Sequence, residues 1–111
     1  MMLYHITSQS QWQQAQQLGD YRPPSLQSEG FIHCSTRQQV LLTANRFFQH
    51  QIGLVLLGID PKLIGAIIRD DAADDDFFPH IYGPLNLDAV LYVWQLIPDA
   101  CGTFTTLPKI G

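Results

Sequence analysis

The sequence is poor in charged residues, and in basic residues above all. Only 14% of its 111 residues are charged, with six Lys or Arg against ten Asp or Glu, which gives a net charge of −4 at pH 7. Proteins that bind extended nucleic acid usually carry a basic stripe, because phosphate contacts supply much of their affinity. The scattered basic residues therefore argue against an extended nucleic-acid partner. A small-molecule nucleotide or a small RNA end held in a local pocket is compatible with this composition.

Cysteines and long hydrophobic runs are also scarce. The two cysteines, Cys34 and Cys101, do not suggest a disulfide framework, which favours a reduced, cytoplasmic protein. The longest strongly apolar run, residues 54–59, is far shorter than the roughly 20 residues that a membrane-spanning helix needs. Residues 1–5 lack the basic region of a secretory signal. We therefore expect no membrane association, and the sequence indicates no particular protein partner.

Hydrophobic residues, in contrast, make up 46% of the chain. A chain of this size buries roughly two-thirds of the surface that its unfolded form exposes, which suffices for a core without disulfides or metal. Disordered chains have a lower hydrophobicity and a higher charge. No repeat or interdomain linker interrupts the sequence, so we predict a single domain over residues 1–111.

Capping signals mark the starts of two helices. Ser8 and Thr36 are each followed three residues later by Gln, which is the capping-box pattern. Apolar residues at helical spacing follow both, so the sequence predicts helices over residues 8–19 and from residue 36 to about residue 50.

Short apolar segments predict the strands. Residues 54–59 are apolar throughout, as is typical of a central strand buried on both faces, whereas Pro79 indicates an edge or irregular strand. Residues 20–29 and 70–76 are predicted to be loops. Strands are expected at residues 3–7, 30–35, 54–59, 66–69, 78–82 and 90–97, with residues 103–107 pairing back as a hairpin. Two helices packed on a largely antiparallel or mixed sheet give an α+β fold.

Three histidines, His5, His33 and His80, lie within predicted strands. Side chains alternate between the faces of a strand, so each His shares a face with a hydroxyl group two positions away. These hydroxyl groups belong to Thr7, Ser35 and Tyr82. If the three faces converge, they form a cleft that can orient a sugar or phosphate, or transfer a proton. The alternative is that each His is a core residue bonded to a backbone carbonyl.

Two further groups of side chains extend this hypothesis. Ser35, Thr36 and Arg37 stand at a helix start, where backbone N–H groups favour an anion, although ordinary N-capping is the favoured explanation. Asp70 ends the predicted strand at residues 66–69 and can point into the cleft. The remaining acids of residues 70–76 are expected to be solvated. The spacing of the histidines matches no helical zinc site, so we expect no metal.

Four segments carry a resemblance to a known family. They are Leu3-Tyr4-His5-Ile6-Thr7, Gly30-Phe31-Ile32-His33-Cys34-Ser35-Thr36, Leu56-Leu57-Gly58-Ile59-Asp60 and Phe78-Pro79-His80-Ile81-Tyr82-Gly83-Pro84-Leu85. In this order they resemble the small bacterial family known as domain of unknown function 952, over essentially the whole chain. The resemblance implies a fold similar to the ADP-ribosyltransferase catalytic core, a split mixed or antiparallel sheet with flanking helices around an NAD cleft.

The resemblance also implies roles for individual residues. His5 matches the strand residue that hydrogen-bonds the nicotinamide ribose, and Tyr82 the aromatic residue that stacks on nicotinamide. Asp70 stands where the superfamily usually has a catalytic Glu, and its side chain is one methylene shorter. The pyrophosphate of NAD would be held by Arg22 or Arg37 and the helix start at Thr36.

Three functions follow from these observations. The first is an enzyme with NAD or an ADP-ribosylated molecule as substrate and no certain cofactor. Its expected catalytic residues are His5, His33 and Asp70, and its expected substrate-binding residues are Thr7, Arg22, Ser35, Thr36, Arg37, His80 and Tyr82. The second is a non-catalytic module that binds a nucleotide, sugar or peptide in the same cleft. The third is a structural or partner protein whose histidines are core residues.

Overall fold

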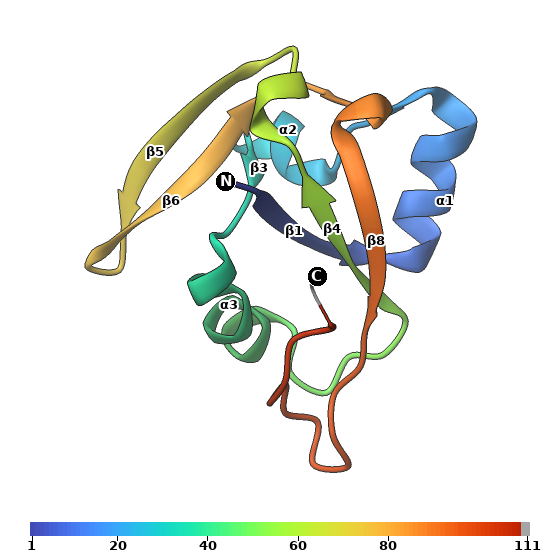
Figure 1. Ribbon diagram of the computed structural model, residues 1–111, viewed down its shortest axis with the longest axis vertical. Helices are drawn as coiled ribbons and strands as arrows, with labels where there is room; N and C mark the ends of the chain where they lie inside the picture. The colour runs from blue at the N-terminus through green and yellow to red at the C-terminus, as the bar shows by residue number, and fades with distance from the viewer. Residues whose placement is uncertain (110–111) are drawn as a thin grey trace.

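The computed structural model describes residues 1–109 as an α+β structure with three groups of antiparallel strands (Figure 1). The elements follow one another as β1 (Leu3–Ser8), α1 (Gln9–Leu18), β2 (Asp20–Tyr21), α2 (Pro24–Ser28), β3 (Ile32–His33), α3 (Val40–Phe47), β4 (Leu54–Ile59), β5 (Ile67–Ala73), β6 (Asp76–Tyr82), β7 (Leu85–Asn86) and β8 (Val90–Leu96). Single 3-10 turns lie at Arg37–Gln39, Pro61–Leu63 and Leu87–Ala89. The predicted α+β class is confirmed.

The first sheet has the order β1-β4-β8, with β4 in the middle. Leu3 of β1 pairs with Ile59 of β4, and Leu54 of β4 pairs with Leu96 of β8. All six residues of β4 are buried, because strands flank it on both edges and side chains cover both faces. The prediction of a central strand at residues 54–59 is therefore confirmed.

The two long helices cover opposite faces of this sheet. Along β1, successive side chains point to opposite faces. Leu3 packs in one hydrophobic cluster with Trp12 of α1, whereas Tyr4 packs in the other with Val40 and Ala44 of α3. Both capping signals are present, the first at the start of α1 and the second at the 3-10 turn Arg37–Gln39, which leads directly into α3. The Ser8 hydroxyl accepts a hydrogen bond from the third residue of α1, and Thr36 forms a reciprocal capping box.

The second sheet has the order β3-β6-β5, and β5 and β6 form a long hairpin that extends to one side of the molecule (Figure 1). Pairing continues from Ile67 opposite Tyr82 to Ala73 opposite Asp76. The prediction of an acidic loop at residues 70–76 is therefore wrong. A buried side chain holds the hairpin against the molecule, because Gln39 Nε2 donates to Asp76 Oδ2 and to the Phe77 carbonyl, at 2.8 Å each. A local sequence pattern does not reveal such long-range contacts.

A main-chain bridge joins the two sheets at residues 4 and 35. The Tyr4 N–H donates to the Ser35 carbonyl at 2.9 Å, and the Ser35 N–H donates to the Tyr4 carbonyl at 2.7 Å. This bridge fixes β1, and with it His5, beside the segment that carries His33.

Three other sequence expectations are wrong in detail. Residues 20–29 contain β2, which pairs with β7, and the helix α2, which starts at Pro24. The strand β6 is the middle strand of its sheet despite Pro79, because the strand β3 beside it pairs over only two residues and the Pro79 carbonyl accepts a bond from the Cys34 N–H. Residues 103–107 form no strand, because Phe104 is instead buried against α3, where its N–H and carbonyl bond the Asn45 amide.

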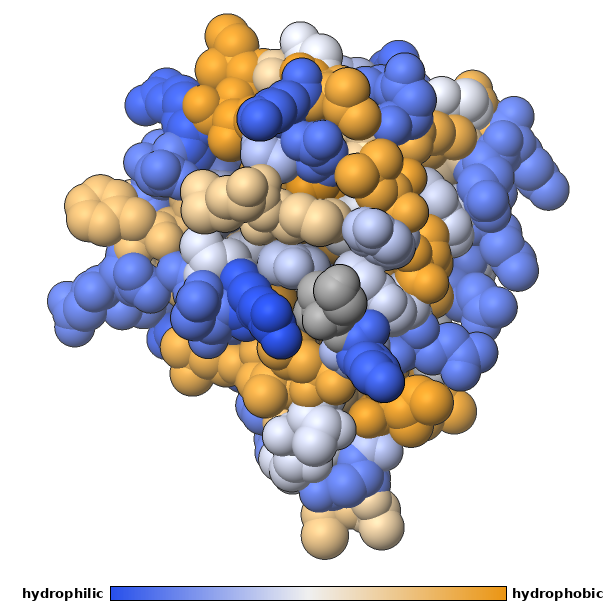
Figure 2. Space-filling view, viewed as in Figure 1, coloured by the Kyte–Doolittle hydropathy of each residue, from blue (hydrophilic) through white to orange (hydrophobic). Residues whose placement is uncertain are grey.

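The outer strand β8 leaves apolar side chains exposed, among them Leu91 and Val93, and Figure 2 shows hydrophobic residues on the face of the molecule that carries it. Tyr92 stacks on Trp94, with ring centroids 5.2 Å apart. No helix within residues 1–109 has both the length and the hydropathy needed to cross a bilayer.

The central strand provides a test of the fold. Leu56 is fully buried, so Leu56→Ala should lower the free energy of unfolding by about 2–5 kcal/mol through lost burial and the resulting cavity. Leu18→Ala is the matched control, because the Leu18 side chain at the end of α1 is 67% exposed. Urea unfolding should show a change of less than about 0.5 kcal/mol for this control. Equal losses in the two variants would contradict the central position of β4.

Candidate functional site

A groove of about 950 Å³ is lined by β1, β3, the β5–β6 hairpin, α3 and the segment around α2. We call it the histidine groove. Six of the ten residues predicted from the sequence line it, namely His5, Thr7, His33, Ser35, His80 and Tyr82. The predicted convergence of three strand faces is therefore present in the structure.

Strand register brings two of the histidines together. His33 of β3 lies directly opposite His80 of β6, and their ring centroids are 5.2 Å apart. The Phe31 ring stacks on His80 with centroids 4.1 Å apart and lies 5.3 Å from the Tyr82 ring. These side chains form an aromatic wall of the groove.

Asp71 is the carboxylate that contacts this aromatic wall. His80 Nδ1–H donates to Asp71 Oδ2 at 2.7 Å, and the Tyr82 hydroxyl donates to the same oxygen. The hydrogen bond from Tyr82, and then that from His80, holds the pKa of the Asp71 carboxyl below its usual value. Asp71 is therefore a carboxylate at neutral pH.

Asp70 lies outside the groove, contrary to the expectation that it points into the cleft. It pairs with Pro79 within the hairpin and is exposed. Neighbouring residues of a strand point to opposite faces, so the face that carries Asp71 is not the face that carries Asp70. The sequence placed the end of the strand at Arg69, whereas β5 continues to Ala73. Strand alternation along the longer strand would have identified Asp71.

A second histidine–carboxylate pair lies nearby. His33 Nε2–H donates to Glu29 Oε2 at 2.9 Å, and both side chains are about half exposed. The Phe31 ring packs edge-on against His33, with centroids 4.8 Å apart. Glu29 was missed from the sequence because residues 20–29 read as a loop.

His5 is buried, and both of its ring nitrogens are hydrogen-bonded. Nδ1 bonds the His33 carbonyl, and Nε2 lies 2.6 Å from the Tyr21 hydroxyl. Burial lowers the pKa of His5 to about 4, so the ring is neutral at pH 7. Because a carbonyl can only accept, Nδ1 carries the proton, and Nε2 of the neutral ring has the lone pair that faces the Tyr21 hydroxyl.

Tyr21 extends this hydrogen-bonded chain. Its hydroxyl lies 2.9 Å from Thr7 Oγ1, which in turn lies 2.8 Å from Gln11 Oε1. Burial raises the pKa of Tyr21 well above its ordinary value, so its hydroxyl stays protonated. Thr7 is thus placed in the groove as predicted, with protein partners on both sides. Tyr21 itself was missed because β2 was not predicted.

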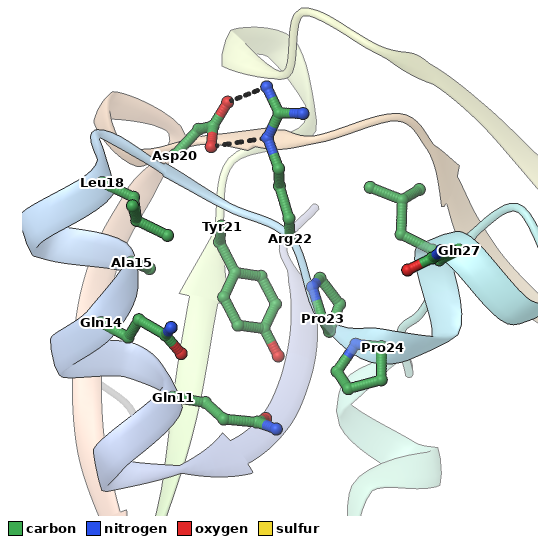
Figure 3. A pocket seen from close by; sticks show the side chains of 11 residues that line it. Gln11, Gln14, Ala15, Leu18, Asp20, Tyr21, Arg22, Pro23, Pro24 and Gln27 are labelled. Atoms are coloured by element: carbon green, nitrogen blue, oxygen red, sulfur yellow. Dashed lines mark hydrogen bonds and ion pairs between the residues drawn. The ribbon is translucent and has the colours of Figure 1, made fainter.

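Arg22, the first basic residue of the predicted site, lies in a neighbouring pocket of about 550 Å³ between α1 and α2. Figure 3 shows its ion pair with Asp20 at one end of this pocket and the Tyr21 hydroxyl pointing toward Gln11 at the other. The two bonds to Asp20 are 2.9 and 3.0 Å long. Gln11 and Tyr21 line both this pocket and the histidine groove.

The helix start at Thr36 also lies outside the groove. The Thr36 N–H donates to Gln39 Oε1 at 3.0 Å, and Arg37 is exposed. Ordinary capping thus accounts for the hydrogen bonds at this helix start. The structure does not bring Thr36, Arg37 or Arg22 together with the three histidines.

The charge of the groove is predominantly acidic. Its lining contains three carboxylates, those of Glu29, Asp71 and Asp74, and one guanidinium group, that of Arg46. Arg46 is paired with Asp74 at 2.9 Å. A dianionic ligand would be repelled by these carboxylates, whereas a neutral or cationic group would not. Residues 1–109 contain no cluster of three or more His, Cys, Asp or Glu side chains placed to hold a metal ion.

Comparisons with known proteins agree with this architecture. Residues 6–93 match the model of a family described as "Protein of unknown function (DUF952)". The crystal structures of the protein CC0527 from Caulobacter crescentus and of its double mutant are 31% identical in sequence to this chain. Each superposes on this chain with a TM-score of 0.86, and the match covers 93% of this chain and 92% of the CC0527 chain. The solution NMR structure of CC0527 superposes with a TM-score of 0.80, and the match covers 93% of this chain and 90% of the CC0527 chain. No curated protein matches the chain.

The buried neutral His5 predicts a pH dependence of stability. Its pKa is about 4 in the folded protein, against 6.5 as its ordinary value. Between these pH values the unfolded chain binds a proton that the folded chain does not, so stability falls as the pH is lowered through this range. The total loss should be about 3 kcal/mol. His5→Gln should remove this part of the dependence in urea unfolding between pH 7 and pH 4.5.

His33→Gln is the control for this experiment, because its backbone carbonyl can still accept the hydrogen bond from His5. The carboxyl groups of Asp71 and Asp76, whose pKa values are lowered by hydrogen bonds from Tyr82 and Gln39, contribute only as the pH falls below their usual value of 3.8. A slope that persists unchanged in His5→Gln would contradict the assignment.

Proposed function

We propose that this chain, which belongs to the family described as "Protein of unknown function (DUF952)", has an ADP-ribosyltransferase-like fold and binds the nicotinamide-ribose end of NAD, or of a related ADP-ribosyl compound, in the histidine groove. Cleavage of the bond between ribose and nicotinamide is the reaction that the groove supports best. The observation that carries the proposal is the Asp71 carboxylate, held in the groove by His80 and Tyr82.

The aromatic wall suits a cationic ring. Nicotinamide bound to ribose is a positively charged pyridinium, and aromatic faces attract such cations. Phe31 and Tyr82 provide such rings, with centroids 5.3 Å apart. One face of Phe31 is stacked on His80, and the guanidinium group of Arg69 already lies 5.3 Å from the Tyr82 centroid, so a ligand cation would use the other face of Phe31 or take the place of Arg69. The carboxylates that line the groove favour the same charge. This end of the dinucleotide therefore matches the groove better than its pyrophosphate does.

Asp71 has the chemistry required of the catalytic carboxylate. When the glycosidic bond breaks, nicotinamide leaves with the electron pair and positive charge develops on the ribose. A fixed carboxylate stabilises that charge more in the transition state than in the bound substrate, which is the requirement for catalysis. Two hydrogen bonds already orient Asp71, so little reorganisation is needed.

A second candidate function is non-catalytic binding of a nucleotide or sugar in the same groove. The state of His5 favours it, because both ring nitrogens are occupied by protein partners and a ribose hydroxyl would have to displace Tyr21. In this case His5 shapes the groove without touching the ligand. Turnover distinguishes the two functions.

Ligand binding is the first test. NAD added to the 15N-labelled protein should shift the amide signals of Phe31, His33 and Tyr82 saturably, and nicotinamide mononucleotide should do the same. ADP-ribose should bind more weakly, because it lacks the cationic ring. If millimolar NAD shifts no signals from the groove, both candidate functions for this ligand fail.

Turnover is the second test. Asp71→Asn should lower the rate of nicotinamide release by about 100-fold or more, because the amide no longer offsets the developing charge. Asp70→Asn is the matched control on the neighbouring residue and should keep the rate within about twofold. Release of nicotinamide that is equally fast in both variants would exclude Asp71 as the catalytic carboxylate. Binding of NAD without any release by the wild-type protein would favour the non-catalytic function.

A further inference from the structure

We propose that Glu29 and His33 activate the group that accepts the ribosyl unit, and that this group is a hydroxyl. The inference rests on the proposed function and adds to it the second substrate and two residues that act on it. His33 is the base that touches the acceptor, and Glu29 is a positioning residue that acts through His33.

The chain between α2 and β3 is folded so that Glu29 faces His33. Glu29 follows the last residue of α2, and its N–H donates to the Ser25 carbonyl at 2.7 Å. The Ser25 hydroxyl donates to the Phe31 carbonyl at 2.9 Å, which ties the beginning of β3 to the helix. Gly30 lies between them with φ of 88°, a conformation that glycine adopts at little cost. This turn, rather than a continuous helix, brings residues 29 and 33 together.

The hydrogen bond to Glu29 selects the tautomer of His33. A carboxylate only accepts, so Nε2 carries the proton and Nδ1 has the free lone pair in the neutral ring. Within residues 1–109, Nδ1 makes no hydrogen bond that would occupy this lone pair. The ring is thus arranged as a base whose opposite nitrogen is held by an acid, the arrangement used by many hydrolytic enzymes.

Of the three histidines in the groove, His33 is the one open to an incoming molecule. The exposed fraction of its side chain is 51%, against 7% for the side chain of His80. His80 already uses Nδ1 to bond Asp71, and His5 uses both nitrogens. The two histidine–carboxylate pairs therefore have different roles. Asp71–His80 acts on the ribosyl unit, and Glu29–His33 acts on the acceptor.

The groups around His33 come from several elements. Glu29 contacts it after α2, His80 faces it from β6, and His5 of β1 bonds its carbonyl. Asp71 of β5 lies beyond His80. Phe31 covers one side of the ring. Glu29 is the carboxylate in direct contact, so it stabilises the imidazolium that forms when Nδ1 takes up a proton.

The bond between the ribose carbon and the nicotinamide nitrogen breaks, and neutral nicotinamide leaves with the electron pair. The oxygen of water or an alcohol forms a bond to that carbon, and its proton passes to His33 Nδ1 and then to solvent. A hydroxyl is neutral at pH 7 and gains most from such a base, whereas an alkylamine is protonated and has no free electron pair to donate.

The tautomer can be measured without any substrate. Nitrogen-15 shifts of the His33 ring at high pH should show the proton on Nε2 in the wild-type protein. The preference should weaken in Glu29→Gln, because the amide can also donate. A proton on Nδ1 in the wild-type protein would overturn the proposal.

Kinetics test the role in catalysis. His33→Gln should lower kcat for nicotinamide release about 100-fold, and Glu29→Gln on the order of 10-fold, with little change in KM. Glu29→Asp should recover part of the rate, and Ser28→Ala is the neighbouring control that should not lose any. Unchanged kcat in both His33→Gln and Glu29→Gln would overturn the role of this pair while leaving the proposed function standing. No release by the wild-type protein would overturn both.

Added methanol identifies the acceptor. With an alcohol-accepting site the products should include the O-methyl glycoside of ADP-ribose, whereas a site that admits only water should give ADP-ribose alone. Both are hydroxyl acceptors and support the proposal. Transfer to methylamine with neither hydroxyl product would contradict it.

Discussion

The main-chain bridge between Tyr4 and Ser35 is the contact on which the histidine groove depends. The sheet of β1, β4 and β8 and the sheet of β3, β6 and β5 are separate hydrogen-bonded units, and this bridge joins them beside the groove. The bond from His5 to the His33 carbonyl adds a side-chain link at the same place. One hydrophobic cluster contains Leu3 of the first sheet together with Ile32 and Ile81 of the second, so this packing and the bridge together fix the position of His33 and, through strand pairing, of His80.

Much of this arrangement follows from local sequence patterns. The capping signals locate α1 and the 3-10 turn that leads into α3, and the apolar run locates β4. Alternation along β1 and β6 places His5 and His80 in a shared groove. These features depend on neighbouring residues, so their signals are present in short stretches of sequence. The family resemblance added the order of the motifs, and residues 6–93 bear out that family.

The sequence failed where non-local contacts decide the structure. Pairing of the β5–β6 hairpin continues to Ala73, and Gln39, 37 residues before Asp76, bonds its far end. Alternation along this longer strand puts Asp71 rather than Asp70 on the face of His80. Tyr21 reaches His5 because β2 pairs with the distant β7. Arg22 lies in a neighbouring pocket, where it is paired with Asp20. Residue type alone could not have predicted any of these placements.

The hairpin that carries Asp71 is attached to the molecule unevenly. Its base pairs with β3 over only two residues, and the ion pair between Asp74 at its turn and Arg46 on α3 is about half exposed. Such an exposed pair contributes only about 0–1 kcal/mol and is weakened by salt. Gln39 bonds Asp76 and Phe77, which directly follow the same turn, so its two hydrogen bonds hold this end of the hairpin on α3's side of the molecule when salt screens the ion pair. Salt should therefore weaken the contact between Arg46 and Asp74 while the wall of the groove that carries Asp71 keeps its position.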